Sequence, residues 1–114
     1  MKMIMAIVQP NKLNRIKKLL FENNINRFIV DDCFGHSDED SIIETYRGVE
    51  MELDLKHKIR IQIAVNDDYV DRAVNAILQG GKSGKIGDGK IFVYPIERCY
   101  RIATGEEGET SIGD

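Results

Sequence analysis

The stretch Ile59-Arg60-Ile61-Gln62-Ile63-Ala64-Val65 alternates large aliphatic side chains with polar or small ones. Such alternation is typical of a β-strand with one buried face, because successive side chains point to opposite sides of a sheet. Asn66-Asp67-Asp68 then offers helix-capping side chains, and apolar residues recur at helical spacing over residues 70–78. After the glycine-rich residues 80–89, residues 90–94 have the composition of another strand. This part of the chain therefore predicts a β-α-β unit.

The first half of the chain repeats this order, with its apolar positions recurring at an offset of half the chain. A strand is predicted over residues 3–8, a helix with Asn11 as N-cap over residues 13–20, and a second strand over residues 25–34. Two such units predict the α+β class with a ferredoxin-like split βαβ-βαβ arrangement, in which two helices cover one face of an antiparallel sheet. The uncovered face of this sheet predicts self-association.

The length of 114 residues suits one domain, and the composition is that of a globular protein. We assign residues 1–105 to that domain, with a long loop over residues 36–55, and residues 106–114 to a flexible acidic tail. The loop carries seven acids and one base, and the tail four acids and no base, whereas the net charge of the whole chain is only −3. The body is therefore basic, although the overall balance argues against a nucleic-acid binder. With no apolar run of about 20 residues and no recognisable secretory leader, the cytoplasm is the expected compartment.

Residues 80–90, GGKSGKIGDGK, combine five glycines with three lysines. Glycines allow backbone N–H groups to approach a ligand closely, and ammonium groups add positive charge, so this composition suits a phosphate-binding loop. The order of residues differs from that of a Walker motif. Taken alone, such a loop also serves as a structural turn.

Three longer motifs make the chain resemble one family. Residues 84–93 (GKIGDGKIFV), 46–50 (YRGVE) and 101–106 (RIATGE) are similar to signature segments of the PII nitrogen-regulatory signal-transduction proteins, and the resemblance runs collinearly from Lys2 to about Gly108. It implies a homotrimer that binds ATP or ADP in clefts between subunits, with 2-oxoglutarate bound through Mg-ATP. It further implies a regulator rather than an enzyme, which contacts its target through the long loop.

The resemblance also implies the residues of the nucleotide site. The glycine loop would surround phosphates, and Arg101 would reach a phosphate from the cleft wall. Lys58 would bind 2-oxoglutarate together with Glu39, although a solvated lysine at the start of a strand is the alternative. The implied nucleotide-binding residues are Ile7, Gly35, Ser37, Asp38, Ala64, Gly87, Asp88, Gly89, Lys90 and Arg101.

The base of the long loop departs from the family. Residues 35–39 read Gly-His-Ser-Asp-Glu, where typical members have Gly-Phe-Gly-Arg-Gln. Ser37 adds a side chain where backbone approaches ligand, and Asp38 puts a negative charge in place of a phosphate-binding arginine. Glu39 replaces a glutamine that helps to hold Mg²⁺, which a carboxylate can also ligate. A further arginine and an adenine-seating threonine are replaced by Ala103 and Ile29. We therefore expect ADP or AMP to compete better with ATP than in typical members, and 2-oxoglutarate binding does not follow from the resemblance alone.

The resemblance assigns partner binding to three residues of the long loop, Tyr46, Arg47 and Met51. Met51 stands where the family's modified tyrosine is found, so uridylylation or adenylylation at that position lacks a hydroxyl. Arg47 is the only base of the loop and corresponds to the residue that enters the pore of ammonium channels. Tyr46 has an alternative role as a packing residue. An ammonium transporter, which would be the only link to a membrane, and glutamine synthetase are candidate partners.

Two other functions stay open on the sequence. A small phosphate-handling enzyme of the same fold, such as an acylphosphatase, needs an arginine in the loop after the first strand, where residues 9–12 read Gln-Pro-Asn-Lys. A metal-responsive trimer would use His36, Asp38 and Asp40, which alternate along the loop, although a solvated acidic loop explains the same pattern. The two cysteines lack the paired spacing of a zinc site.

Overall fold

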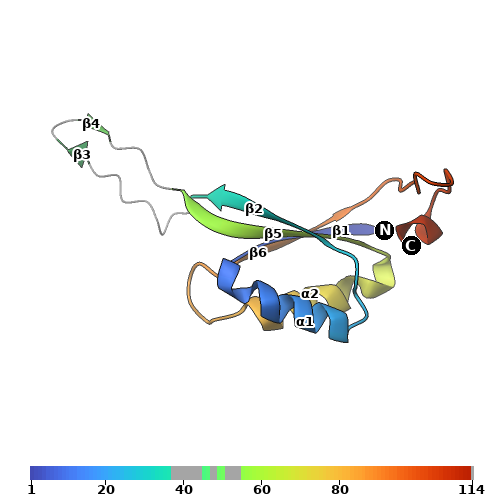
Figure 1. Ribbon diagram of the computed structural model, residues 1–114, viewed down its shortest axis with the longest axis horizontal. Coiled ribbons are helices and arrows are strands. Elements are labelled where there is room, and N and C mark those ends of the chain that lie inside the picture. Colours follow the sequence, from blue (N-terminus) through green and yellow to red (C-terminus); the bar gives the residue numbers. More distant parts are fainter. Residues whose placement is uncertain (37–44, 47–48, 51–54, 114) are drawn as a thin grey trace.

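The computed structural model describes residues 1–36, 45–46, 49–50 and 55–113. Strands β1 (Lys2–Val8), β2 (Ile29–Gly35), β5 (Lys56–Val65) and β6 (Gly89–Pro95) form an antiparallel sheet in the order β2-β5-β1-β6. Helices α1 (Leu13–Glu22) and α2 (Val70–Gly81) cover one face of this sheet (Figure 1). The predicted ferredoxin-like α+β arrangement is confirmed. A separate pair of short strands consists of β3 (Thr45–Tyr46) and β4 (Val49–Glu50).

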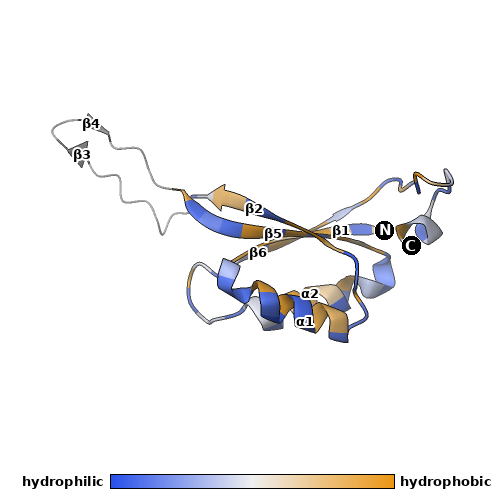
Figure 2. Cartoon of the chain, viewed as in Figure 1, coloured by the Kyte–Doolittle hydropathy of each residue, from blue (hydrophilic) through white to orange (hydrophobic). Residues whose placement is uncertain are grey.

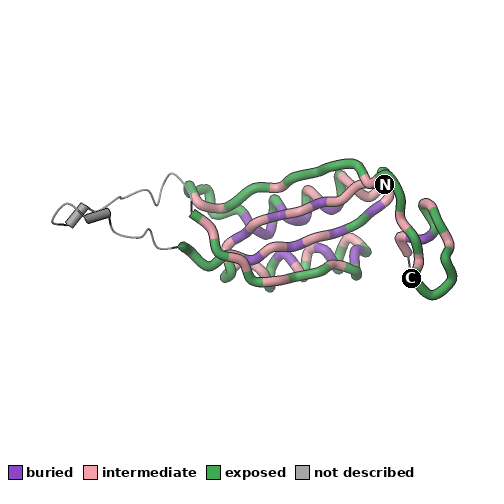
Figure 3. Tube along the Cα trace, turned by 90° about the horizontal axis from the view of Figure 1, so that it is seen from above, coloured by how far each residue is buried: buried purple, intermediate pink, exposed green. Residues whose placement is uncertain are grey.

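The core lies between the two central strands and the helices. In β1, Ile4, Ala6 and Val8 are buried, and in β5 the buried positions alternate in the same way, as the alternating sequence predicted. Figure 3 shows these buried positions on the central strands, with more exposed chain at the edges of the sheet. The helices supply the other half of the core through hydrophobic stripes (Figure 2), whose buried members are Ile16, Leu20, Ala73, Ala76 and Ile77.

Helix α2 extends farther than the sequence predicted, because it includes two residues assigned above to the glycine-rich loop. Gly80 and Gly81 are the last residues of the helix and both are buried. A Cβ atom on Gly80 would lie 2.8 Å from the Cα atom of Ile16 in α1. The glycine is therefore needed for close packing of the two helices and not for approach to a ligand.

Both helices begin at the residues that the sequence predicted, Leu13 and Val70, but without the predicted caps. A short 3-10 turn precedes each one, over Pro10–Lys12 before α1 and over Asp67–Tyr69 before α2. The predicted caps are wrong, since the described residues contain no side-chain cap hydrogen bond at the start of α1 or α2. The amide of Asn66 instead donates to the carbonyl oxygen of Glu109, at 3.1 Å. The Asn66 side chain thus bonds to a residue remote in sequence and not to the backbone at the start of the adjacent helix.

Strand β2 begins at Ile29, four residues later than predicted. Ile25 instead closes the turn that follows α1, because its backbone N–H donates to the carbonyl oxygen of Leu20 at 2.9 Å and its side chain is buried in the core. An aliphatic residue that closes a helix resembles a strand residue in the sequence, and this explains the error.

The face of the sheet opposite the helices carries both charged and apolar side chains. Arg60 of β5 forms an ion pair with Asp31 of β2, and this pairing lowers the pKa of Asp31 and raises that of Arg60. Ile29 and Phe92 are exposed to 66% and 46%. We call this surface the uncovered face.

The chain after β6 folds into a small structure of its own. Tyr100 and Glu107 form a β-bridge, a 3-10 helix spans Glu109–Ile112, and Ser111 is buried. The sequence predicted no regular structure here, because hydrogen bonds that join the tail to residues 99–101 leave no periodic pattern. Figure 1 shows this segment, in orange and red, at the end of the sheet opposite the loop between α2 and β6.

Candidate functional site

The loop over residues 82–88 connects α2 to β6, and its conformation depends on glycine. Gly84, Gly87 and Gly89 have φ angles of 81°, 101° and 104°, which residues with a side chain rarely adopt. A Cβ atom on Gly89 would lie only 1.7 Å from the carbonyl oxygen of Ile7 in β1. The loop backbone therefore lies directly against β1, and two residues implied for the nucleotide site, Ile7 and Gly89, are brought together.

The carboxylate of Asp88 holds the loop in shape. It accepts hydrogen bonds from the backbone N–H of Ser83 at 2.8 Å, from that of Gly84 at 3.1 Å, and from the hydroxyl of Ser83. These donors lower the pKa of the Asp88 carboxyl, the Ser83 side chain having the largest effect. Asp88 thus organises the loop from within, a role that the motif in the sequence did not indicate.

Lys58 of β5 reaches the same loop. Its Nζ atom donates to the carbonyl oxygen of Gly87 at 3.3 Å, and Nε2 of Gln9 donates to that oxygen at 3.1 Å. The structure therefore joins the lysine implied for 2-oxoglutarate to the loop implied for phosphate. Lys58 is partly buried, and the role implied for it in binding 2-oxoglutarate stays a prediction.

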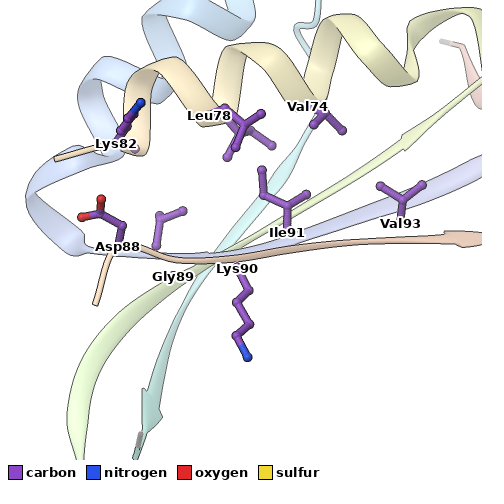
Figure 4. Close-up of a pocket in the computed structure, with 11 residues that line it drawn as sticks. Val74, Leu78, Lys82, Asp88, Gly89, Lys90, Ile91 and Val93 are labelled. Carbon is purple, nitrogen blue, oxygen red and sulfur yellow. The ribbon is translucent and has the colours of Figure 1, made fainter. Parts of the chain in front are cut away.

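Lys90 adds a second ammonium group next to this loop. Figure 4 shows its side chain pointing away from the helices, toward the uncovered face. Ile7 lies between Lys90 and Arg60 in the sheet register, so the three form one row across that face. Because Lys58 precedes Arg60 by two residues on the same strand, it projects to the same side. Arg60 is paired with Asp31, so it is the ammonium groups of Lys58 and Lys90 that place positive charge at the end of the uncovered face beside the glycine loop, which is a suitable environment for a polyanion.

An apolar pocket lies on the other side of the glycine loop, between α2 and β6. Its volume is about 450 Å³, and its walls include Val74 and Leu78 from the helix and Ile91 and Val93 from the strand (Figure 4). Lys82, Asp88, Gly89 and Lys90 also line it. Leu78 belongs to the apolar pattern of residues 70–78 but is 52% exposed, because β6 is an edge strand of the sheet that the structure describes.

Other implied residues lie far from the glycine loop in one copy of the chain. Ala64 pairs with Met3, whereas Gly89 pairs with Val8, five residues away along β1 and hence about 17 Å distant. Ala64 instead lines a pocket of about 170 Å³ with residues 24–27, Ile112 and Gly113. Gly35 ends β2, where it pairs with Lys56.

Arg101 also lies apart from the glycine loop, in the C-terminal segment. Its Nη1 atom donates to Oε2 of Glu106 at 2.8 Å, and its Nη2 atom donates to the carbonyl oxygens of Thr110 and Gly113, both at 2.9 Å. A single copy of the chain therefore does not bring Arg101 or Ala64 to the glycine loop. The site that the resemblance implies would need surfaces from a second copy.

Several implied residues fall outside the described part of the chain. These are Ser37, Asp38, Glu39, Arg47 and Met51, and of Tyr46 the structure describes the backbone in β3. The loop-base changes and the metal predictions at Glu39 and Asp38 therefore stay predictions. Within residues 1–36 and 55–113, no three His, Cys, Asp or Glu side chains are grouped so that they could hold a metal ion. None of the described helices is long and apolar enough to cross a membrane.

A polar contact at the start of the long loop was missed by the sequence reasoning. Nε2 of His57 in β5 lies 2.7 Å from Oδ1 of Asp32 in β2, and the His57 ring packs beside Phe34 with centroids 5.4 Å apart. These contacts join the two strands from which the loop departs. The motifs of the chain do not include these residues, and only the strand register brings them together.

Comparisons of the sequence with known proteins identify the family. The family model for nitrogen regulatory protein P-II matches residues 1–106. The chain is 42% identical over 112 residues to nitrogen regulatory protein P-II of Pasteurella multocida, an alignment that covers 98% of this chain and 100% of the relative. The same identity and coverage are found with nitrogen regulatory protein P-II of Rhodospirillum rubrum and with nitrogen regulatory protein P-II 1 of Escherichia coli strain K12. The chain therefore belongs to the nitrogen regulatory protein P-II family.

Proposed function

We propose that this signal-transduction protein is a cytoplasmic homotrimer that binds adenine nucleotide in clefts between its subunits. In response, it regulates an enzyme of nitrogen or carbon metabolism or an ammonium transporter. The observation that carries the proposal is the glycine loop packed against Ile7, with Lys58 bonded to the carbonyl oxygen of Gly87. Loops with glycines at positive φ expose backbone N–H groups to anions, and the two lysines supply charge that stabilises a polyphosphate.

The separation of the implied residues supports a cleft between subunits. Arg101 and Ala64 lie at the end of the sheet opposite the glycine loop. A neighbouring copy that presents this end to the loop would complete the site, and Arg101 would then contact a phosphate through its planar guanidinium. The apolar residues on the uncovered face, such as Phe92, supply surface for the assembly.

The proposed ligands are ATP, ADP and AMP, with a shift toward the nucleotides that carry fewer phosphates. The support for this shift is the residue set at the loop base, where Asp38 would repel a triphosphate and Ser37 would crowd it. Glu39 is the proposed oxygen ligand for a Mg²⁺ ion that accompanies ATP. Lys58 and Glu39 are the proposed residues for binding 2-oxoglutarate together with Mg-ATP.

Isothermal titration calorimetry with ATP, ADP and AMP, each with and without 2-oxoglutarate, tests the ligands. The variant Lys58→Met should bind ADP roughly ten- to hundredfold more weakly, since a hydrogen bond to a charged group typically contributes about 1.5–3 kcal/mol. Lys18→Met, which removes an exposed lysine of α1, is the matched control and should bind like the wild type. Absence of nucleotide binding by the wild type would refute the site. Tight ATP binding that 2-oxoglutarate strengthens would refute the proposed shift in ligand preference.

Target regulation is proposed to depend on residues 36–55, whose net charge is negative and whose one base is Arg47. A pull-down with the intact protein and with a version lacking residues 36–55, each in ATP and in ADP, identifies the target. We expect an enzyme such as glutamine synthetase or an ammonium transporter to be retained by the intact protein alone, in a nucleotide-dependent manner. Equal retention by both proteins would exclude the loop as the contact.

A regulator fits the chain better than the alternative of an acylphosphatase-like enzyme. That reaction needs an arginine after the first strand, and Gln9-Pro10-Asn11-Lys12 occupies this position. In the structure these residues begin α1 through a 3-10 turn, and Gln9 is bonded to the glycine loop. The proposal therefore assigns the loop to ligand sensing and not to catalysis.

A further inference from the structure

The guanidinium of Arg101 is occupied by the chain's own C-terminal segment. It donates to three acceptors, the carboxylate of Glu106 and the carbonyl oxygens of Thr110 and Gly113. Two backbone hydrogen bonds close the same turn, from the N–H of Arg101 to the carbonyl oxygen of Glu106 and from that of Gly105 to the carbonyl oxygen of Arg101. The carboxylate and the two carbonyl oxygens surround the guanidinium much as the oxygens of a phosphate would.

The segment that supplies these acceptors is itself attached to the body of the protein. The hydroxyl of Ser111 donates to the carbonyl oxygen of Cys99 at 2.8 Å, and the Ser111 residue is only 7% exposed. The amide of Asn66 donates to the carbonyl oxygen of Glu109. The contacts with Arg101 therefore belong to a folded unit that includes most of residues 106–113 and not to one chance ion pair.

We propose that residues 106–113 act as an internal latch, in which the Glu106 carboxylate and the tail carbonyl oxygens hold Arg101 in place of a nucleotide phosphate. This inference rests on the proposed function, because it concerns the arginine assigned there to phosphate. Nucleotide must displace the latch before Arg101 can bind it. The observed affinity for nucleotide is consequently the intrinsic affinity multiplied by the fraction of molecules in which the latch is open.

The latch can open because it lies near the surface. The side chains of Arg101 and Glu106 are 28% and 38% exposed. Exposed ion pairs are weak, since water competes for both charges, and a phosphate with more negative charge can replace the carboxylate. Opening would also remove Ile112 and Gly113 from the pocket beside Ala64. Nucleotide binding and release of the tail are therefore expected to be coupled.

Calorimetric titration of Glu106→Gln and Glu107→Gln with ATP tests the latch. Both substitutions remove one negative charge from neighbouring positions, but only the Glu106 side chain bonds to Arg101. We expect Glu106→Gln to bind ATP roughly two- to fivefold more tightly, the range that measured energies of exposed ion pairs imply, and Glu107→Gln to match the wild type. Adenosine, which has no phosphate, should bind all three proteins equally. Unchanged or weaker ATP binding by Glu106→Gln would overturn the proposal, because Glu106 would then be neutral or would position Arg101 for the ligand.

A chain ending at Gly105 serves as the second variant, since it removes all three acceptors of Arg101 at once. Its thermal melting shows whether it remains folded.

Hydrogen exchange on the wild type gives an independent measurement. ATP should accelerate exchange at the N–H of Ser111, which is bonded to the carbonyl oxygen of Gly108. If ATP binds but slows this exchange, the latch is wrong while the proposed function stands. If ATP binds none of these proteins, both are wrong.

Discussion

Asp88 and Gly89 are adjacent in the sequence but serve the glycine loop in different ways. Gly89 is required because of what it lacks, as a side chain there would overlap the carbonyl oxygen of Ile7. Asp88 is required because of its carboxylate, which collects the hydrogen bonds of Ser83 and Gly84. The first role concerns the fit of the loop to β1, and the second concerns the internal conformation of the loop.

Gly89→Ala should destabilise the protein by about 2 kcal/mol or more, because it combines a positive φ with a steric overlap against backbone. Gly84→Ala is the matched control. Gly84 also has a positive φ, but no described atom lies within 4 Å of the position that a Cβ atom would take there, so this variant should lose only about 1 kcal/mol. Urea unfolding measures both. Equal losses would show that the contact with Ile7 is not the cause.

Asp88 gives the loop a defined dependence on pH. Its pKa is lowered in the folded state, so its contribution to stability is fully present above the ordinary aspartate pKa and is lost as the pH falls through the folded value. We therefore expect wild-type stability to fall more steeply below about pH 4 than that of Asp88→Asn. Thermal melting from about pH 2.5 to about pH 7 checks this, with Glu97→Gln as a control for an exposed acid. Parallel curves for the wild type and Asp88→Asn would contradict it.

At the scale of elements, the packing of α1 against α2 decides the length of α2. A pair of glycines normally weakens a helix, since glycine loses more conformational freedom than other residues on folding. Gly80 is nevertheless helical and buried, because the backbone of α1 at Ile16 approaches too closely for a side chain. Tertiary contact has overridden local preference at this position.

Alanine at the two glycines should therefore have opposite effects. Gly80→Ala should destabilise by about 1–3 kcal/mol through overlap with the Ile16 backbone. Gly81→Ala should be neutral or stabilise by up to about 1 kcal/mol, since its Cβ atom would lie 3.5 Å from the nearest atom, an ordinary contact. Chemical denaturation of both variants measures the difference. A stabilised Gly80→Ala would mean that the helices can separate without loss.

At the scale of the whole molecule, the two faces of the sheet differ in their exposure. The helices bury one face, while the uncovered face exposes Ile29 and Phe92 beside a row of charged side chains. An exposed apolar surface of this kind is usually covered in an assembly. The basic body of the chain also contrasts with its acidic long loop, a division that the net charge of −3 conceals.

Phe92→Glu should convert the proposed trimer to monomers, because it would place a charge in the buried centre of the assembly. Phe21→Glu is the matched control, as Phe21 has a similar exposure, 52% against 46%, but lies on α1 on the helical side. Light scattering after size-exclusion chromatography should give three times 13.0 kDa for the wild type and the control and 13.0 kDa for Phe92→Glu. A wild-type monomer would refute the trimer, and a trimeric Phe92→Glu would place the interface elsewhere.

The sequence alone was sufficient for the fold class, because strand alternation and helical spacing are local patterns that burial imposes directly. The repeat of the two halves and three contiguous motifs were likewise sufficient to indicate the family. Helix ends were predicted less well. Asn66 has the composition of a cap, yet its amide bonds to Glu109, and no local pattern could reveal that partner.

Only the tertiary structure decided how the candidate site is distributed. It joined Lys58 to the glycine loop and left Arg101 and Ala64 at the opposite end of the sheet, because strand register and not sequence distance sets these separations. It also revealed that Arg101 is held by the tail, a set of contacts between side chain and backbone that leaves no periodic signal. Local periodicity thus determined the elements of this protein, whereas contacts between residues remote in sequence determined which of its charges are available to a ligand.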